Sequence, residues 1–242
     1  MTGQDLVDEL RESYLDDTKI PYNWQDLELL KFLNRAEQQT CRRSYLIIDS
    51  TTAADAAGNP ICQVTLIPNQ AVYSFSRLVL QVERCKLSQM SLPLRPRTRD
   101  ELDAQTFQWE ATLGTSGTAG TAGGDIVVWP TWFIHEVNGE IVFVKTPTIN
   151  DIAYLIVSRL PLIDFTLKTS PEIESQHHDG LLPWAAHLAF LKPDSDTQDL
   201  NLATIYDKIF TERFGPLPDA YAEKMRKMLP RQQRMRPRTF GS

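Results

Sequence analysis

The chain has 242 residues, a net charge of −6 at pH 7 and a mean hydropathy of −0.30. Its 42% hydrophobic and 23% charged residues are typical of an ordinary globular protein, which excludes a mini-protein held together by disulfides or metal. No apolar run approaches the roughly 18 residues that span a bilayer, so we expect no transmembrane segment. Asp5, Asp8 and Glu9 lie where a secretory signal would be apolar, and we therefore expect a protein of the cytoplasm.

Two helices are predicted at the start of the chain. The first extends from Leu6 to Leu15 and is followed by a turn over residues 16–21. The second begins near Asn23 or Trp24 and continues to Cys41, because its apolar residues fall within one arc of about 140° at 100° per residue. That arc contains Leu29, Leu30, Leu33, Ala36 and Cys41.

From Ser44 the sequence changes to the alternating, β-branched pattern of strands. The turn Pro68-Asn69-Gln70 predicts that residues 63–67 and 71–75 pair as a hairpin. A capping box over residues 98–101 predicts a short helix to about Thr106. The strands expected in this region are 44–50, 63–67, 71–75 and 78–87, with a small-residue loop over 51–60.

The glycine-rich stretch 114–124 has no side chain large enough to pack and predicts a mobile loop. Beyond it, Asn138-Gly139 is a strong hairpin signal and predicts that residues 133–137 pair with residues 140–145. The middle of the chain is therefore predicted to be antiparallel β, with further strands over 126–129 and 152–160.

Helical character returns at Ser170, a predicted cap, with Pro171 at the first position of a helix that continues to His178. Gly180 and Pro183 should break it before a nearly all-apolar helix over 181–191, which must be buried on most sides. Pro193 ends that helix, Asp194 or Asp196 is expected to cap the next, and Gly215-Pro216 ends the last. The apolar arc of the last helix contains Leu202, Ala203, Tyr206, Ile209, Phe210 and Phe214.

This order of elements predicts the α+β class. Two N-terminal and two C-terminal helices would form a helical bundle, with an inserted antiparallel β domain and an extended basic C-terminal arm. The expected divisions are 1–43 and 166–215 for the bundle helices, 44–165 for the β domain and 216–242 for the arm.

Charge is distributed unevenly along the chain. From Tyr221 to Ser242 there are seven basic residues and one acidic residue, a net charge of +6, which leaves −12 on the rest. Such a tail favours an acidic protein surface, another subunit or nucleic acid, unless it is solvated without a fixed partner. Arg95, Arg97 and Arg99 form a second basic patch, which in an extended segment would face one side and suit an acidic partner or a DNA backbone. An exposed loop of solvated arginines is the alternative.

Metal binding has little support in the sequence. The only dense set of ligand types is His177, His178 and Asp179 with His187, but adjacent histidines point about 100° apart on a helix. No cysteine or glutamate completes a zinc spacing. We therefore expect no metal.

Other site patterns are also missing from the sequence. The glycines of 114–124 match neither a dinucleotide-binding nor a phosphate-binding motif, and Asp194, Asp196 and Asp199 lack the glycine and glutamate of a calcium loop. No nucleophile motif is present. We expect no cofactor and no enzyme activity. The three cysteines, Cys41, Cys62 and Cys85, are too widely spaced for a metal pair and are expected to be reduced and buried.

Several stretches share a distributed family pattern. They are EQQTCRRSYLII, VTLIPNQAVYSF, LVLQVERCKL, PLRPRTRDELDAQTFQW and RLPLIDFTLKTSPEIESQHHDGLLPWAAHLAFLKPDSDTQD. Together, from about Trp24 to Phe214, they resemble the head-to-tail adaptor (connector) proteins of tailed bacteriophages.

The resemblance implies a structural virion protein of the neck, assembled in the host cytoplasm. It implies a ring of twelve copies that joins the portal to tail or nozzle proteins and helps to retain packaged DNA, which passes through the channel without specific binding. Positional analogy places portal binding on the C-terminal arm. The residues expected to make it are Met228, Leu229, Arg231, Arg234, Met235, Arg236, Arg238 and Phe240.

Three other functions stay open at this stage. Another ring component of the neck or tail, such as a stopper or tube-like protein, would be favoured by a predominantly β fold. A metal-dependent enzyme would use His177, His178 and Asp179. A nucleic-acid-binding module would use the basic tail.

Overall fold

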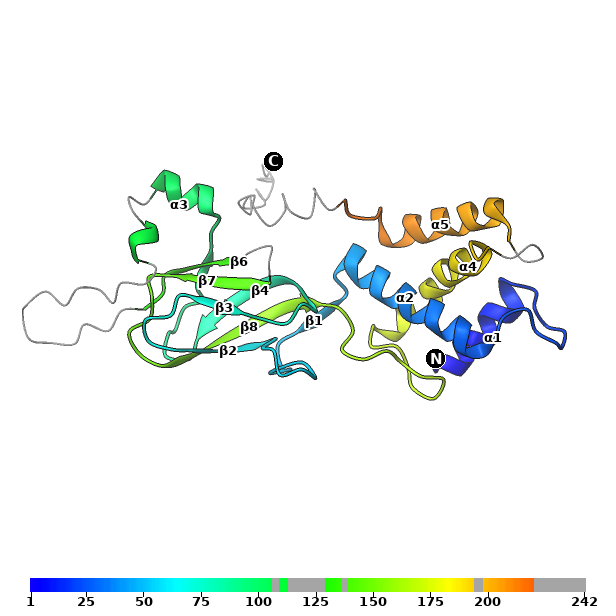
Figure 1. The fold of residues 1–242 in the computed structure, drawn as a ribbon, viewed down its shortest axis with the longest axis horizontal. Helices are drawn as coiled ribbons and strands as arrows, with labels where there is room; N and C mark the ends of the chain where they lie inside the picture. Colours follow the sequence, from blue (N-terminus) through cyan, green and yellow to red (C-terminus); the bar gives the residue numbers. More distant parts are fainter. Residues whose placement is uncertain (106–108, 113–128, 136–138, 194–197, 220–242) are drawn as a thin grey trace, which may run out of the picture. The chain divides into compact units, whose positions relative to one another are not determined.

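The computed structural model describes residues 1–105, 109–112, 129–135, 139–193 and 198–219. The predicted α+β class is confirmed, because helices begin and end the described chain and strands lie between them (Figure 1). The chain divides into two compact units. The helical unit comprises residues 1–49, 78–81 and 157–218, and the β unit comprises residues 50–77 and 82–156 apart from the gaps given above.

Four α-helices and a 3-10 helix make up most of the helical unit. The first helix begins with a capping box, in which the Thr2 Oγ1 accepts from the Asp5 amide at 3.3 Å and the Asp5 carboxylate accepts from the Thr2 amide at 2.8 Å. The elements are α1 (Gly3–Ser13), α2 (Asp26–Ser44), the 3-10 helix η2 (Ser175–Leu181), α4 (Leu182–Phe190) and α5 (Leu200–Phe214). Both predicted N-terminal helices are therefore confirmed, with ends shifted by two to three residues.

One apolar core joins these helices. Leu6 and Leu10 of α1 and Leu29 and Leu33 of α2 have no exposed surface. The predicted apolar helix is α4, and it is buried on most sides as expected; its small residues Ala185, Ala186 and Ala189 allow α2 and α5 to approach closely. The core forms because each helix presents an apolar stripe that only the others can cover.

Two predictions in the C-terminal helices are wrong. No helix starts at Pro171, since the amides of Glu172 and Ile173 donate to the Glu37 carboxylate of α2 and the chain turns helical only at Ser175. The last helix is capped by Asp199, whose carboxylate accepts from the amides of residues 201 and 202 at 2.8 and 3.1 Å. Asp194 and Asp196, the predicted caps, lie outside the described residues.

Gly180 has a packing role that the sequence does not reveal. The sequence predicts it as a helix breaker, but its backbone lies against the end of α5, where a Cβ atom would overlap the ring of Phe214 and the side chain of Arg213. The break itself falls as expected, between η2 and α4, with Pro183 in the first turn of α4.

The first sheet is built around the long strand β8. Strands β1 and β2 pair antiparallel with successive parts of β8, with Ile48 opposite Ser158 and Val64 opposite Ala153, while β4 pairs with β8 as well. The boundaries between the two units fall within β4 and β8. The strands are β1 (Ile47–Asp49), β2 (Gln63–Leu66), β4 (Val79–Leu87) and β8 (Asp151–Arg159).

The second sheet has the order β3-β7-β6-β5 and lies in the β unit. Its strands β6 and β7 pair antiparallel as predicted, with Phe133 opposite Phe143, while residues 136–138 of the connecting turn lie outside the described residues. β5 pairs parallel with β6, so this sheet is mixed and not purely antiparallel. The strands are β3 (Val72–Ser74), β5 (Arg95–Pro96), β6 (Trp132–His135) and β7 (Glu140–Val144).

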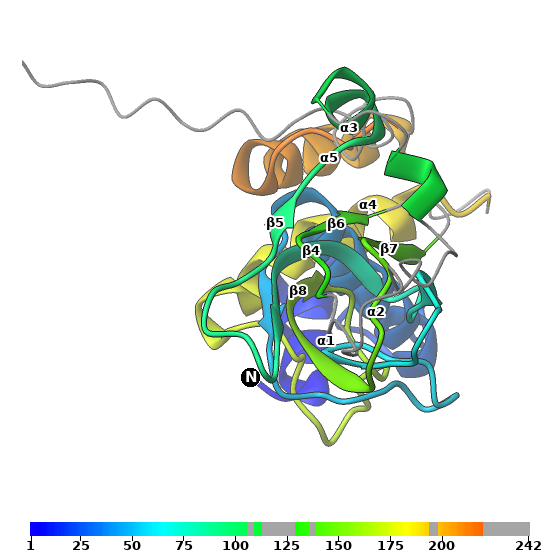
Figure 2. The same cartoon turned by 90° about the vertical axis from the view of Figure 1, so that its left-hand side faces the viewer.

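A helical layer covers one face of the second sheet (Figures 1 and 2). It consists of α3 (Arg99–Gln105) and the 3-10 helix η1 (Trp109–Thr112). Leu102 and Trp109 pack on Ile134, Val142 and Val144 of the sheet. The predicted capping box starts α3, because Thr98 Oγ1 accepts from the Glu101 amide at 3.3 Å and the Glu101 carboxylate accepts from the Thr98 amide at 3.2 Å.

The predicted hairpin over residues 63–75 is wrong, because β2 and β3 belong to different sheets. The Tyr73 hydroxyl accepts from the Ile67 amide at 2.8 Å and lies 2.9 Å from the Gln70 carbonyl. It thereby occupies the backbone groups that a hairpin ladder would use. Residues 68–70 instead form a corner between the sheets. The predicted strand 126–129 falls mostly, and the glycine-rich loop 114–124 entirely, outside the described residues.

Candidate interaction surfaces

The predicted basic patch lies where β5 leads into α3. Arg95, on β5, is exposed, Arg97 is half-buried, and Arg99 is the first residue of α3. The extended geometry that would place all three side chains on one face covers only Arg95 and Arg97, because the Thr98 cap starts a helix.

Two of these arginines have acidic partners. Arg97 Nη1 lies 3.5 Å from a carboxylate oxygen of Glu101, and Arg99 Nη1 lies 3.3 Å from one of Glu110. The Arg99 guanidinium also lies 5.7 Å from the centre of the Trp109 ring. These contacts link α3 to η1 and reduce the positive charge that the patch offers to a partner, although exposed pairs of this kind contribute only about 0–1 kcal/mol each.

The eight predicted portal-binding residues of the C-terminal arm, between Met228 and Phe240, lie outside the described residues. The structure does describe the point where the C-terminal segment leaves α5. The Arg43 Nη1 donates to Thr211 Oγ1 at 2.9 Å and to the Gly215 carbonyl at 3.0 Å, and the Ser44 hydroxyl donates to the Phe214 carbonyl at 2.9 Å. We call this set of five residues the Arg43 clamp.

Arg43 lies against two aromatic rings that also contact each other, with their ring centres 5.0 Å apart. Its side chain is 2% exposed, and its guanidinium carbon lies 4.8 Å from the ring centres of both Trp184 and Phe210. Burial lowers the pKa of Arg43, while Asp207, whose carboxylate lies 3.7 Å from Nη2, raises it. An arginine keeps its charge in such a place, so a buried cation stands at the C-terminal end of α5. The sequence gives no signal of this, because 168 residues separate Arg43 from Thr211.

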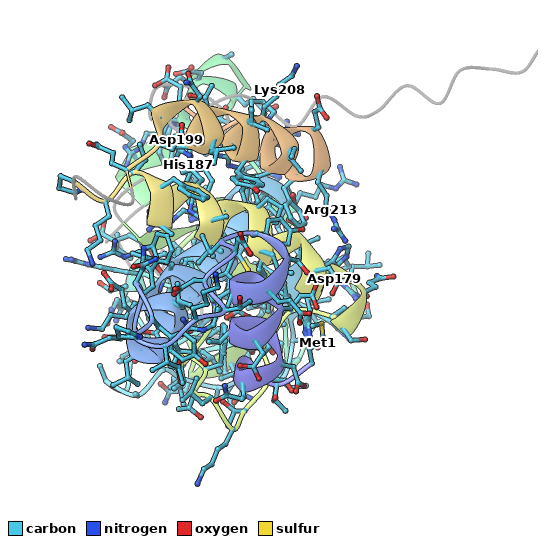
Figure 3. All side chains as sticks on the ribbon, turned by 90° about the vertical axis from the view of Figure 1, so that its right-hand side faces the viewer. Met1, Asp179, His187, Asp199, Lys208 and Arg213 are labelled. Atoms are coloured by element: carbon cyan, nitrogen blue, oxygen red, sulfur yellow. The ribbon has the colours of Figure 1, made fainter. Side chains whose placement is uncertain are left out.

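The histidines of the predicted ligand set have structural partners. His178 is buried and lies 3.0 Å from the Ile173 carbonyl, and burial lowers its pKa. His187 Nδ1 lies 2.7 Å from the Ala203 carbonyl, which joins α4 to α5 (Figure 3). No group of three or more metal-ligand side chains occurs within the described ranges. The set is therefore not assembled as a metal site.

A buried ionic network fixes the chain after β8. Arg159 Nε donates to Asp49 at 2.7 Å, and its Nη2 donates to Glu172 at 2.5 Å. Glu37, 1% exposed, accepts the amides of Glu172 and Ile173 at 2.6 and 3.1 Å, and burial raises its pKa to about 7. This network positions the segment that leads to η2, and it has no signature in the sequence.

The connection between α1 and α2 displays apolar side chains from a rigid frame. The Arg11 guanidinium donates to Asp17 at 2.7 Å and to Asp26 at 2.5 Å, and lies 3.9 Å from the centre of the Tyr22 ring. Ile20 within this loop is nevertheless 84% exposed. The loop is a candidate contact surface that charge and motif analysis missed.

In the part of the chain that the structure describes, no helix is both long and apolar enough to cross a membrane. No curated protein matches the sequence. A family model does match it: the family described as SU10 adaptor protein, over residues 1–238. That match includes seven of the eight predicted arm residues, all but Phe240, which the phage-adaptor resemblance, from Trp24 to Phe214, does not reach.

Proposed function

Because the chain belongs to the SU10 adaptor protein family, a family of phage head-to-tail adaptors, we propose that it joins the portal vertex of the capsid to the tail. The family match over residues 1–238 is the observation that supports this function. The protein would then be a structural component of the virion neck. Its partners would be the portal protein on one side and tail or nozzle proteins on the other.

The adaptor is proposed to act as a closed ring, for which we expect twelve copies. A ring repeats each contact with the portal, so that a modest affinity per copy becomes a strong joint. Such a joint suits the retention of packaged DNA. Assembly would take place in the cytoplasm of the host.

The C-terminal arm is the part proposed to bind the portal. Its net charge of +6 over residues 221–242 favours an acidic partner, and Met228, Met235 and Phe240 offer adaptable apolar contacts. The Arg43 clamp supports this assignment, because it fixes the start of the segment that leads to the arm. Arg95 is proposed as a second partner-facing residue, since it is exposed and outside the pairs that Arg97 and Arg99 form.

DNA is proposed to pass the ring without specific binding. Outside residues 221–242 the chain has a net charge of −12, which repels phosphate and lets DNA slide. We propose no catalytic role, in keeping with a family of structural proteins. A stopper or tube-like protein would be favoured by a mostly β fold, whereas the described part of this chain contains five α-helices.

The test is the mass of the purified protein, alone and mixed with the portal protein of the same phage, by light scattering and negative-stain imaging. A truncated chain that ends at Ala220 is the comparison. We expect ring-shaped adaptor on the portal, and its loss in the truncated chain. A full-length monomer that ignores the portal at both low and moderate salt would contradict the proposal.

A further inference from the structure

The last turn of α5 and the residue after it are hydrogen-bonded to side chains of α2. A helix end leaves four carbonyl groups without intrahelical partners. At the end of α5, the Phe214 carbonyl accepts from Ser44 and the Gly215 carbonyl accepts from Arg43, both on α2. The Gly215 amide in turn donates to the Thr211 carbonyl at 2.8 Å. The end of α5 is therefore fixed by α2 as well as by its own backbone.

Arginine is suited to this position for three reasons. Its planar group lies against the rings of Trp184 and Phe210, its Nη1 reaches two acceptors while its Nη2 faces Asp207, and its charge complements the negative end of the α5 dipole. The cost of burying the cation is offset only while these contacts persist.

The residues that follow the clamp restrict the chain further. Gly215 has φ +88° and ψ 170°, a conformation open to glycine, and Pro216 and Pro218 fix their own φ angles. Each proline also holds the residue before it away from helical geometry. Leu217, between the prolines, is 58% exposed. We call residues 215–219 the leader, a short stiff segment that joins the fixed end of α5 to the basic stretch 221–242 of the arm.

We infer that the Arg43 clamp and the leader together position the C-terminal arm, so that the arm leaves the helical unit from one fixed point and in one direction. The inference rests on the proposed function, in which the arm binds the portal. Arg43 is then a positioning residue: it acts on the partner through the chain that it holds.

The physical gain is preorganisation. Binding must remove whatever backbone freedom the start of the arm has in the free protein, and a fixed exit removes part of that freedom in advance. In a ring, a defined exit also presents every arm at the same spacing, so that the arms can engage repeated sites together.

The leader can be loosened without touching the clamp or the core. In the double variant Pro216→Gly/Pro218→Gly we expect the full-length chain to bind the portal about tenfold more weakly, because each substitution adds backbone freedom. Because the same substitutions add freedom to the unfolded chain, they can lower its stability slightly, so binding is compared at a temperature where both chains are fully folded. Binding is measured by titrating the portal protein against the labelled adaptor.

The clamp is tested by the same change at two adjacent positions. Arg43→Lys keeps the charge but loses the fork and the stacking, whereas Arg42→Lys alters an exposed neighbour on the same helix. We expect weaker portal binding in the first variant and wild-type binding in the second. Because Arg43→Lys can also lower stability, binding is compared at a temperature where both variants are fully folded by circular dichroism.

A spin label attached at Leu217→Cys measures the mobility of the leader directly. The native thiols of Cys41, Cys62 and Cys85 are buried, so the label reacts at the new cysteine. We expect an immobilised spectrum in the wild-type background and a mobile one when Ser44→Ala and Thr211→Val remove two clamp contacts. An equally mobile label in both backgrounds would overturn the inference.

These experiments distinguish a failure of this inference from a failure of the proposed function. If truncation at Ala220 abolishes portal binding but the glycine leader binds as tightly as the wild type, the arm binds and its positioning does not matter, which overturns the inference alone. If the full-length chain does not bind the portal, both proposals fail. Weaker binding by the glycine leader, at a temperature where both chains are fully folded, supports the inference.

Discussion

The two units of the molecule bury different kinds of side chain. In the described residues, the helical unit buries the charged side chains of Arg11, Asp17, Glu37, Asp49 and Arg159, whereas the β unit buries only that of Asp151. Apolar residues fill the β unit instead, with Phe133, Ile141 and Phe143 almost fully covered.

This difference reflects how the connections are held. Chain segments without regular structure leave backbone groups unpaired, and these need partners. In the helical unit the long connections after α1 and after β8 are fastened by charged side chains. In the β unit neighbouring strands pair with each other, and a tyrosine hydroxyl suffices at the corner. The long connections of the helical unit therefore depend on buried charged side chains, whereas in the β unit the Asp55 carboxylate, which accepts from the amides of residues 57 and 59, is only half-buried.

The largest loss of stability is expected when a buried cation is removed from the helical unit. Arg159→Met removes the cation that faces the buried Asp49 carboxylate, and we expect the free energy of unfolding to fall by about 3–5 kcal/mol. Denaturant unfolding measures it, with the exposed Arg42→Met as the control. A loss below about 1 kcal/mol would show that the ionic network is not what holds this region.

A cavity in the β unit should cost somewhat less. Ile141→Ala on β7 removes a fully buried side chain, and we expect a loss of about 3 kcal/mol that does not change with salt or pH. Val72→Ala on the paired strand β3 is the control, because Val72 is exposed. A strong salt dependence of the Ile141→Ala effect would remove the contrast between the units.

The pH dependence of the helical unit should depend on Glu37. Burial raises its pKa from 4.5 to about 7, so the folded state holds the proton more tightly than the unfolded chain. The stability from this group is complete below about pH 4.5 and is lost as the pH rises through about 7, a change of about 2–3 kcal/mol. Glu172 and Asp164 add to the rise, whereas the two backbone amides oppose it.

Glu37→Gln keeps an acceptor for those amides and removes the ionisation. We expect the unfolding free energy of this variant to vary less between pH 5 and 8 than that of the wild type, by urea denaturation. The exposed Glu174→Gln is the control. Equal pH profiles for wild type and Glu37→Gln would mean that Glu37 ionises normally.

The smallest loss of stability is expected when a helix cap is removed, and it should be similar in the two units. Asp199→Ala and Thr98→Ala remove helix caps in the helical and β units, and each should cost about 1 kcal/mol. Thermal unfolding would measure both. Similar losses would show that local capping works alike in the two units, and that their difference lies in long-range contacts; a loss several times larger in one unit would contradict this.

Local patterns predicted much of the fold. The apolar arc of α2, the capping box at Thr98 and the pairing of β6 with β7 around Asn138-Gly139 depend on residues close in sequence, and the structure confirms all three. The family pattern was also distributed along the chain, and the family match confirms it.

The failed predictions share a cause. No helix begins at Pro171 because the Glu172 amide donates to Glu37, about 135 residues earlier in the chain. No hairpin forms over 63–75, where the Ile67 amide donates to the Tyr73 hydroxyl. In both, a side chain took backbone groups that local propensity had assigned elsewhere. The contacts of Arg43 with α5 could not be predicted for a related reason, because they join residues far apart in the sequence. The arm residues were assigned by positional analogy with the adaptor family, and they stay a prediction.

Gly180 limits how this sequence can change over time. Its backbone meets the ring of Phe214 so closely that even a methyl group at position 180 has no room. An alanine there would have to push aside the outer atoms of the Phe214 ring and of the Arg213 side chain. The two positions 180 and 214 should therefore tend to change together in distant descendants, and a mutational screen should find Gly180→Ala less destabilising beside a smaller residue at position 214.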